Sequence, residues 1–423
     1  MSRSHDGRPG EEVFTKVKPT VLIVATSSWS PTARLAMALA HAGCTVDALC
    51  RARHPLGTIR AVRKTYVYRG LTPLMSFSHA IAEMKPDLIV SGDDLATLHL
   101  HRLYEREGGH GEVAKLIERS LGAPESFPVV HARTAFIELA QQECIRAPKT
   151  EVIANADALK QWVGRMGFPA VLKANGSSGG DGVRVVHTFE EALRALSALQ
   201  APPLVSRAVK RALVDHDQTL IWPSLLRCRS VVNAQEFVAG REATSAVACW
   251  KGAVLASLHF EVVNKRDSAG PSCVLRLIEN PEMSAATEKM VRRLKLSGLH
   301  GFDFMLESHT GNAHLIEINP RATQVGHLTL GPGRDLPAAL YAALSGEGLR
   351  PAPKVTENDM IALFPQEWMR DPESAFLQSA YHDVPWEEPE LLRACARIRR
   401  KPSAGHAQQN PVQTLSAIRL PRL

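Results

Sequence analysis

The chain of 423 residues carries 50 Lys and Arg against 43 Asp and Glu, with 45% hydrophobic and 22% charged residues. These proportions are ordinary for a globular protein and leave room for two or three domains with well-buried cores. Residues 391–423 contain no Asp or Glu and seven Arg or Lys, which equals the whole net charge of +7. The rest of the chain is balanced, so we do not expect nucleic acid as a partner.

Cysteine spacing and hydrophobicity indicate the compartment. The seven cysteines are dispersed without a C-x-x-C pair, which is typical of thiols in a reducing compartment. The first residues, MSRSHDGRPGEE, contain no apolar signal segment, and no apolar run approaches the roughly 18 residues of a membrane span. We therefore expect a cytoplasmic protein without a membrane partner. No part of the sequence indicates an oligomeric state.

The first predicted domain spans residues 19–125 and follows a polar, disordered lead-in at residues 1–18. Its predicted strands and helices alternate in the order 20–26, 33–42, 45–50, 79–85 and 87–94. Continuous apolar strands that alternate with helices predict an α/β domain built on a parallel sheet. Asp93 and Asp94 end the last strand and fit two interpretations, a helix cap or side chains that face a ligand cleft.

The second predicted domain spans residues 126–346. Its predicted helices are 132–143, 156–166, 189–196 and 283–298, and its predicted strands are 149–154, 169–172, 183–186, 231–240, 243–250, 253–263, 301–308 and 313–320. Short turns between successive strands indicate antiparallel pairing and therefore an α+β domain. The remaining residues, 347–423, are Pro-rich and then basic, and we predict a C-terminal extension there.

A glycine-rich loop follows the strand that carries Lys173. Residues 175–182 read NGSSGGDG, and glycines of this kind let backbone N–H groups approach phosphate oxygens. No Gly in the chain precedes a Lys, so the loop is not a Walker A motif. The segment also matches G-x-S-x-G with Ser178 as the serine, a motif that requires a strand-to-helix turn, whereas a strand is predicted to follow here. A plain surface hairpin is the remaining alternative.

Two acidic residues lie on neighbouring predicted strands. Asp303 is inside one strand, and Glu317 and Asn319 share a face of the next because they are two positions apart. A hairpin through residues 309–312 would bring the three together as oxygen ligands suited to Mg²⁺. The alternative is a pair of strand carboxylates that form salt bridges with Arg321.

The glycine loop, the acidic strand pair and the order between them resemble the ATP-grasp superfamily. The similarity is to the carbamoyl-phosphate-synthetase-like and D-alanine-ligase-like carboxylate–amine ligases, and it covers residues 131–346. The region from Thr20 resembles the Rossmann-like domain that precedes ATP-grasp in those enzymes. The two specific motifs are the strand lysine with its glycine loop and Glu-Ile-Asn-Pro-Arg at Glu317 to Arg321.

The resemblance implies a role for individual residues. Lys173 and Arg321 would be catalytic, with Lys173 on the nucleotide phosphates and Arg321 on the transferring phosphoryl group. Asp303, Glu317 and Asn319 would bind the metal. The other implied nucleotide-binding residues are Arg133, Ser177, Ser178, Gly179, Gly180, Gln235, Glu236, Phe237, Val238 and Glu242.

Within that set, the resemblance assigns residues 235–238 to the hinge that holds adenine and Glu242 to the ribose hydroxyls. Arg133 stands where the family often has a lysine, and its planar guanidinium replaces a point charge. The turn at residues 144–148, Cys-Ile-Arg-Ala-Pro, lacks the glycine that the family has there.

The implied function is an ATP- and Mg²⁺-dependent ligase, with Mn²⁺ as an alternative ion, that activates a small-molecule carboxylate as an acyl phosphate and joins it to an amine. A catalytically silent ATP-binding module and a serine hydrolase that uses Ser178 are the alternatives. Residues 264–272 lie where such ligases gate the acceptor, and an ordinary surface loop fits them equally well.

Overall fold

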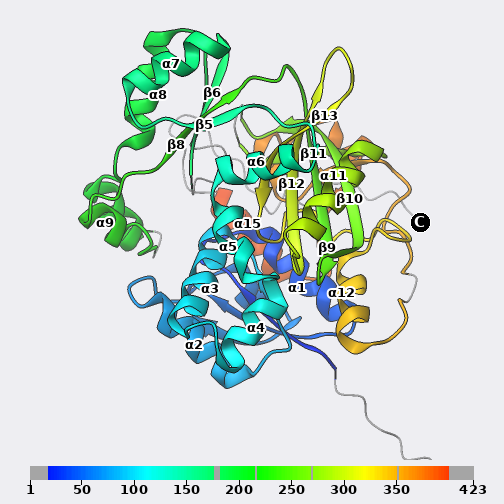
Figure 1. Cartoon of the computed structure of the whole chain (residues 1–423). Coiled ribbons are helices and arrows are strands. Elements are labelled where there is room, and N and C mark those ends of the chain that lie inside the picture. The colour runs from blue at the N-terminus through cyan, green and yellow to red at the C-terminus, as the bar shows by residue number, and fades with distance from the viewer. Residues whose placement is uncertain (1–17, 176–181, 215–216, 268–269, 350–351, 400–423) are drawn as a thin grey trace, which may run out of the picture.

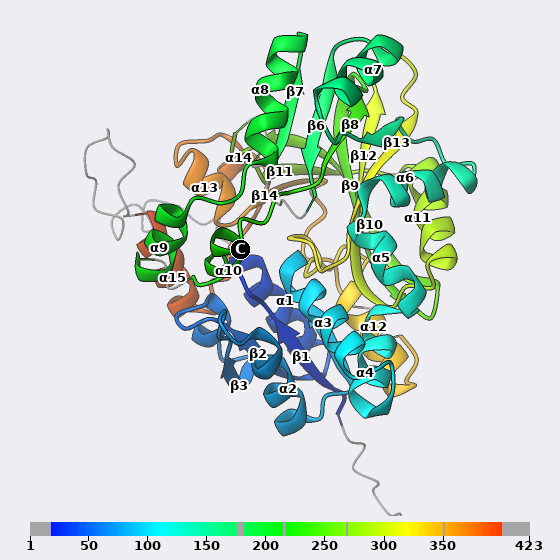
Figure 2. The ribbon, with the colours of Figure 1, turned by 60° about the vertical axis from the view of Figure 1, so that its left-hand side comes forward.

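The computed structural model describes residues 18–175, 182–214, 217–267, 270–349 and 352–399. Its strands form three sheets, and Figures 1 and 2 show the small sheet at one end of the molecule and the parallel sheet at the other. The large sheet lies between these two ends (Figures 1 and 2). None of the helices in these described ranges has the length and apolar character needed to cross a membrane.

The first sheet is parallel, as predicted, with the strand order β3-β2-β1-β4. Its strands are β1 Thr20–Val24, β2 Thr45–Cys50, β3 Val62–Val67 and β4 Leu88–Ser91. Its helices are α1 Ser30–His41, α2 Pro73–Met84, α3 Asp94–Arg106 and α4 Gly111–Leu121, with short helices at η1 Pro55–Thr58, η2 Pro124–Ser126 and α5 Phe127–His131.

Both faces of this sheet are buried. Val21 and Ile23 of β1 belong to one apolar cluster, which includes α1, whereas Leu22 and Val24 belong to another with α2, α3 and α4. Successive strand side chains point to opposite faces, so a strand covered on both sides reads as a continuous apolar run. The sequence TVLIV has that pattern for this reason.

The small sheet is antiparallel and has the strand order β5-β8-β6-β7. Its strands are β5 Thr150–Val152, β6 Ala170–Ala174, β7 Val183–Val186 and β8 Val232–Glu236, and its helices are α7 Ala156–Met166 and α8 Phe189–Gln200. The predicted order of two strands and a helix is confirmed, while most of the glycine loop between the strands lies outside the described residues. Helices α9 Val205–Val214 and α10 Ile221–Leu225 were not predicted, and they lie between this unit and the parallel sheet (Figures 1 and 2).

The large sheet has the strand order β13-β12-β9-β10-β11-β14-β15. Its strands are β9 Gly240–Trp250, β10 Ala253–Lys265, β11 Ser272–Leu277, β12 Gly298–Glu307, β13 Ala313–Asn319, β14 Met360–Leu363 and β15 Tyr381–Asp383. The helices around it are α6 Arg133–Gln142, α11 Pro281–Arg293, α12 Leu336–Ser345, α13 Gln366–Arg370, α14 Phe376–Ser379 and α15 Pro389–Arg399. Helices α6 and α11 share a core with one face of the sheet.

Two features of this sheet differ from the expectations. The single strand predicted at 231–240 is divided, because β8 ends at Glu236 in the small sheet and β9 begins at Gly240 in the large one. Strands β14 and β15 extend the large sheet beyond residue 346, where an extension was expected. The buried Trp368 of that segment shares an apolar cluster with β1 and β11, so the segment packs into the protein.

Candidate functional site

A cavity of about 810 Å³ lies between the small sheet and the large sheet, beside the parallel-sheet unit. Residues of the small sheet, the large sheet and the parallel-sheet unit line it, among them Lys173 of β6, Asp303 and Glu317 of β12 and β13, and Asp94 at the start of α3. Among the predicted site residues, all those that the structure describes line this one cavity: Arg133, Lys173, Gln235, Glu236, Phe237, Val238, Glu242, Asp303, Glu317, Asn319 and Arg321.

The acidic strand pair has the predicted geometry. Asp303 of β12 lies directly opposite Glu317 of β13 in the antiparallel register. Asp303 Oδ1 accepts a hydrogen bond from Thr244 Oγ1 at 2.8 Å, and Asp303 Oδ2 accepts one from Asn319 Nδ2 at 2.9 Å. Burial, reinforced by the charge of Glu317, raises the pKa of Asp303 to about 6 despite these hydrogen bonds.

Two cations from different elements meet Glu317. The guanidinium of Arg133, at the start of α6, donates a hydrogen bond to Glu317 Oε2, and Lys173 Nζ lies 3.8 Å from the same oxygen. Burial by itself raises the pKa of Glu317, but the charges of Arg133 and Lys173 outweigh it, so the pKa is lowered. Lys173 is buried, and its burial lowers the pKa of its ammonium.

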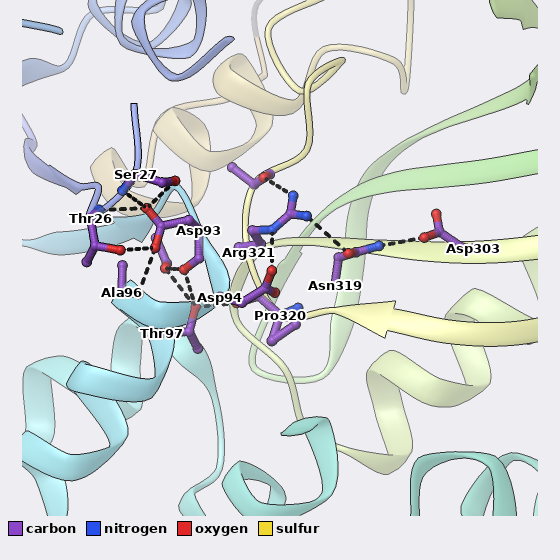
Figure 3. Close-up of polar contacts among 12 residues, drawn as sticks. Thr26, Ser27, Asp93, Asp94, Ala96, Thr97, Asp303, Asn319, Pro320 and Arg321 are labelled. Atoms are coloured by element: carbon purple, nitrogen blue, oxygen red, sulfur yellow. Dashed lines mark hydrogen bonds and ion pairs between the residues drawn. The ribbon is translucent and has the colours of Figure 1, made fainter. Parts of the chain in front are cut away.

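Arg321 joins the site to the parallel-sheet unit (Figure 3). Its Nε lies 3.2 Å from Asp94 Oδ2, and its Nη2 donates to Asn319 Oδ1 at 3.2 Å. Burial by itself lowers the pKa of Arg321, but the Asp94 carboxylate outweighs it and raises the pKa. The alternative that Arg321 pairs with the two strand carboxylates is therefore wrong, because its ion pair is with Asp94 on the start of α3.

The other end of the cavity lies at the crossing from β8 to β9. Residues 235–238 line it, and Phe237 and Val238 belong to the short segment that passes from the small sheet to the large one. Gln235 is held by a hydrogen bond from its Nε2 to Thr150 Oγ1 at 3.0 Å. Glu242 Oε1 accepts a hydrogen bond from Lys265 Nζ at 2.6 Å.

The predicted phosphate loop joins the paired ends of β6 and β7. Ser177, Ser178, Gly179 and Gly180 lie outside the described residues. The ends of the loop are described: Ala174 N donates to Gly182 O at 2.9 Å, and Lys173 pairs with Val183. Both flanking elements are strands, whereas the nucleophile motif requires a strand-to-helix turn, so the structure does not support the hydrolase alternative.

The donor set fits a hard divalent cation that also binds phosphate. Asp303, Glu317 and Asn319 offer oxygen ligands on one side of the cavity. In the described part of the chain, no three His, Cys, Asp or Glu side chains gather closely enough to hold a metal ion by themselves. Mg²⁺ commonly takes one or two carboxylates and completes its coordination with water and substrate phosphates, which matches this set.

Some cavity residues were not predicted from the sequence. Trp29, which precedes α1, and His131, at the end of α5, line the cavity, and so does Gln324 beyond Arg321. The rule that ligands bind at the carboxyl ends of parallel strands would have indicated Trp29, which lies shortly after β1. Nothing in the local sequence marks His131 or Gln324. Gly270, Pro271 and Ser272 of the predicted gating loop also line the cavity.

A cavity between the small antiparallel sheet and the large sheet, with a lysine on one and paired acids on the other, is typical of an ATP-grasp fold. Residues 131–330 match the family described as the carbamoyl-phosphate synthase L chain, ATP binding domain. This part of the chain is therefore similar to that ATP-binding domain. No curated protein matches the chain.

Solved structures share this fold at low identity. One is carboxyaminoimidazole ribonucleotide synthase from Aspergillus clavatus complexed with ATP, with 14% identity over 79% of this chain and 78% of that chain and a TM-score of 0.57. Another is the biotin carboxylase domain of 2-oxoglutarate carboxylase from Hydrogenobacter thermophilus with MgADP and bicarbonate, with 16% identity, coverage of 79% and 71%, and a TM-score of 0.55. A third is N5-carboxyaminoimidazole synthetase from Staphylococcus aureus complexed with ADP, with 13% identity, coverage of 80% for both chains, and a TM-score of 0.55.

Proposed function

We propose that this protein is an ATP- and Mg²⁺-dependent ligase that activates a carboxylate as an acyl phosphate and couples it to an amine. The observation that carries the proposal is the convergence of Lys173, Arg133, Asp303, Glu317 and Arg321 on one cavity. Three cations and two carboxylates around a single space suit the combination of a polyphosphate and a divalent metal. The solved structures of this fold with ATP or ADP support the same choice of nucleotide.

In the proposed reaction, the carboxylate oxygen attacks the γ-phosphorus of ATP, and the bond to the β–γ bridging oxygen breaks to release ADP. The amine nitrogen then attacks the acyl carbon, loses a proton, and displaces phosphate. Asp303, Glu317 and Asn319 would hold Mg²⁺, which, when bound, neutralises charge on the phosphate oxygens. The phosphates would be bound and oriented by Lys173, Arg133 and Arg321. The small sheet would cover the site and exclude water.

The arrangement of the units supports a separate role for each of them. We propose that residues 19–125 serve as the pre-ATP-grasp unit and that residues 126–346 form the ATP-grasp domain. Strands β14 and β15 would complete the large sheet of that domain from outside this range. The adenine would lie against residues 235–238, with Glu242 on the ribose hydroxyls. The carboxylate and the amine would bind beyond Arg321, near Trp29 and Gln324.

The test is ADP and phosphate release from MgATP with pools of small carboxylates and amines. We expect release that depends on both pools, abolished by Glu317→Ala and retained by Ser178→Ala. Glu288→Ala, which removes an exposed carboxylate from α11, is the matched control and should behave like the wild type. Loss of activity in Ser178→Ala alone would favour the hydrolase, and nucleotide binding without release in any pool would favour the silent module.

A further inference from the structure

Asp94 belongs to the parallel-sheet unit and lines the cavity. It is the first residue of α3, and its Oδ2 lies 3.2 Å from Arg321 Nε (Figure 3). We propose that Asp94 is a positioning residue that holds the Arg321 guanidinium in the orientation needed to contact the transferred phosphoryl group. This inference rests on the proposed function, because that function gives Arg321 its role.

The neighbouring Asp93 makes different contacts from Asp94, so the two acids have separate roles. Its carboxylate caps α3 through Ala96 N at 2.9 Å. It also accepts hydrogen bonds from the backbone N–H and the hydroxyl of both Thr26 and Ser27, at 2.6 to 3.2 Å. Asp93 therefore joins the ends of β1 and β4 and provides the helix cap. Asp94 is not needed for the cap, so its carboxylate is available to Arg321.

The backbone around Arg321 is tied to the same turn. Thr97 Oγ1 donates to Pro320 O at 2.8 Å, and Ala322 N donates to Ser91 O at 2.9 Å. These contacts fix the main chain on both sides of Arg321 against the end of β4 and the start of α3. The remaining freedom is the rotation of the long arginine side chain, and Asp94 is the charged group that restrains its Nε.

The guanidinium that Asp94 restrains is connected to the predicted metal ligands. Arg321 Nη2 donates to Asn319 Oδ1, and Asn319 Nδ2 donates to Asp303 Oδ2 (Figure 3). A third contact, from Arg321 Nη1 to Ala322 O at 3.2 Å, completes the set. These three contacts fix the plane of the guanidinium and leave one hydrogen on each Nη to donate to a phosphate.

The first test measures inorganic phosphate binding to the protein saturated with MgADP, by calorimetry. Phosphate is the product that would leave from beside Arg321. We expect Asp94→Asn to weaken phosphate binding about tenfold while MgADP affinity stays within about twofold of the wild type. Removing a negative charge would by itself strengthen phosphate binding, so weaker binding identifies positioning. Equal or tighter phosphate binding in Asp94→Asn would overturn the proposal.

Asp157→Asn is the matched control, because Asp157 lies in the first turn of α7 and lines no part of the cavity. It should share any general effect of removing an acid from a helix N-terminus and leave phosphate binding unchanged. A fall in phosphate affinity in both variants would assign the effect to helix stability and would contradict the proposal.

The second test needs no nucleotide. With ¹⁵N-labelled arginine, the Nε–H resonance of Arg321, assigned by its absence in Arg321→Lys, should be protected from water exchange in the wild type. In Asp94→Asn it should shift and exchange faster. An unchanged resonance would overturn the proposal. If the wild type bound no MgADP, the proposed function would fail, whereas this signal would still report whether Asp94 orients Arg321.

Discussion

Lys173 shows how a single residue can cost stability and serve the site. Its side chain is buried, and burial lowers the pKa of its ammonium. Its ion-pair partner, Glu317, is already bound by Arg133. A buried charge with a shared partner is expensive, because its desolvation is only partly compensated. We therefore regard Lys173 as retained for ligand binding.

For this reason Lys173→Met should leave the free energy of unfolding of the ligand-free protein unchanged or raise it by about 1 kcal/mol. The same change should weaken MgATP binding about tenfold or more, because the phosphates lose a cation. Thermal unfolding and calorimetry on the same preparation measure both. A large loss of stability would show that Lys173 has a structural role.

At the scale of elements, the residue after α4 contacts the chain just before β12, the strand that carries Asp303. Gly122 forms a bridge with Leu296, just before β12, and has φ 104° and ψ −164°. A Cβ on this glycine would lie 2.4 Å from Lys295 O and 2.7 Å from Leu296 Cα. Both the backbone conformation and the close approach therefore require glycine.

Gly122→Ala should accordingly lower the free energy of unfolding by about 3 kcal/mol, combining strain with a backbone clash. The matched control is Gly108→Ala. Gly108 also has a positive φ, but a Cβ there meets no atom within 4 Å, so strain of about 1 kcal/mol is the expected cost. Equal destabilisation of the two variants in chemical denaturation would contradict the close approach at Gly122.

The same scale shows what the sequence could and could not predict. The parallel strands and the hairpin that pairs Asp303 with Glu317 were predictable, because their apolar periods and turn residues are local signals. The β8–β9 division was not, because one continuous strand-like run supplies two sheets. Strands β14 and β15 are short, and β14 pairs with a strand more than 80 residues earlier, so tertiary partners rather than local propensity define them.

For the site, residue types and spacing predicted a set of acids and cations that line one cavity. They did not predict the Arg321 partner, because Asp94 is 227 positions away in the chain. The interpretation that Asp93 and Asp94 are either a cap or cleft residues was too narrow. The structure gives one role to each, since Asp93 caps α3 and Asp94 faces the cavity.

At the scale of the whole molecule, buried histidines make stability depend on pH. Burial lowers the pKa of these histidines to about 3 or 4: His54, His99, His101, His259, His300 and His382. The folded protein keeps them neutral, whereas the unfolded chain takes up protons below about pH 6.5. Stability is therefore complete above that pH and is lost as the pH falls toward the folded-state pKa values.

We expect the thermal midpoint to fall steeply between pH 6.5 and 4, with each such histidine contributing a loss of roughly 2 kcal/mol at pH 5. His300→Gln should make this dependence shallower, because the fully enclosed His300 no longer titrates in the unfolded chain. Midpoints that agree between pH 7.5 and pH 5 in the wild type would contradict the burial of these rings.

The central claim is that the paired strand acids and the opposing lysine form one site for a metal-bound nucleotide. Calorimetric titration of the protein with ATP tests it directly. One titration contains Mg²⁺, and a second contains a chelator in place of Mg²⁺. We predict that Mg²⁺ strengthens ATP binding at least about tenfold in the wild type and that Asp303→Asn removes most of this gain. Absence of ATP binding, or equal binding with and without Mg²⁺, would contradict the account.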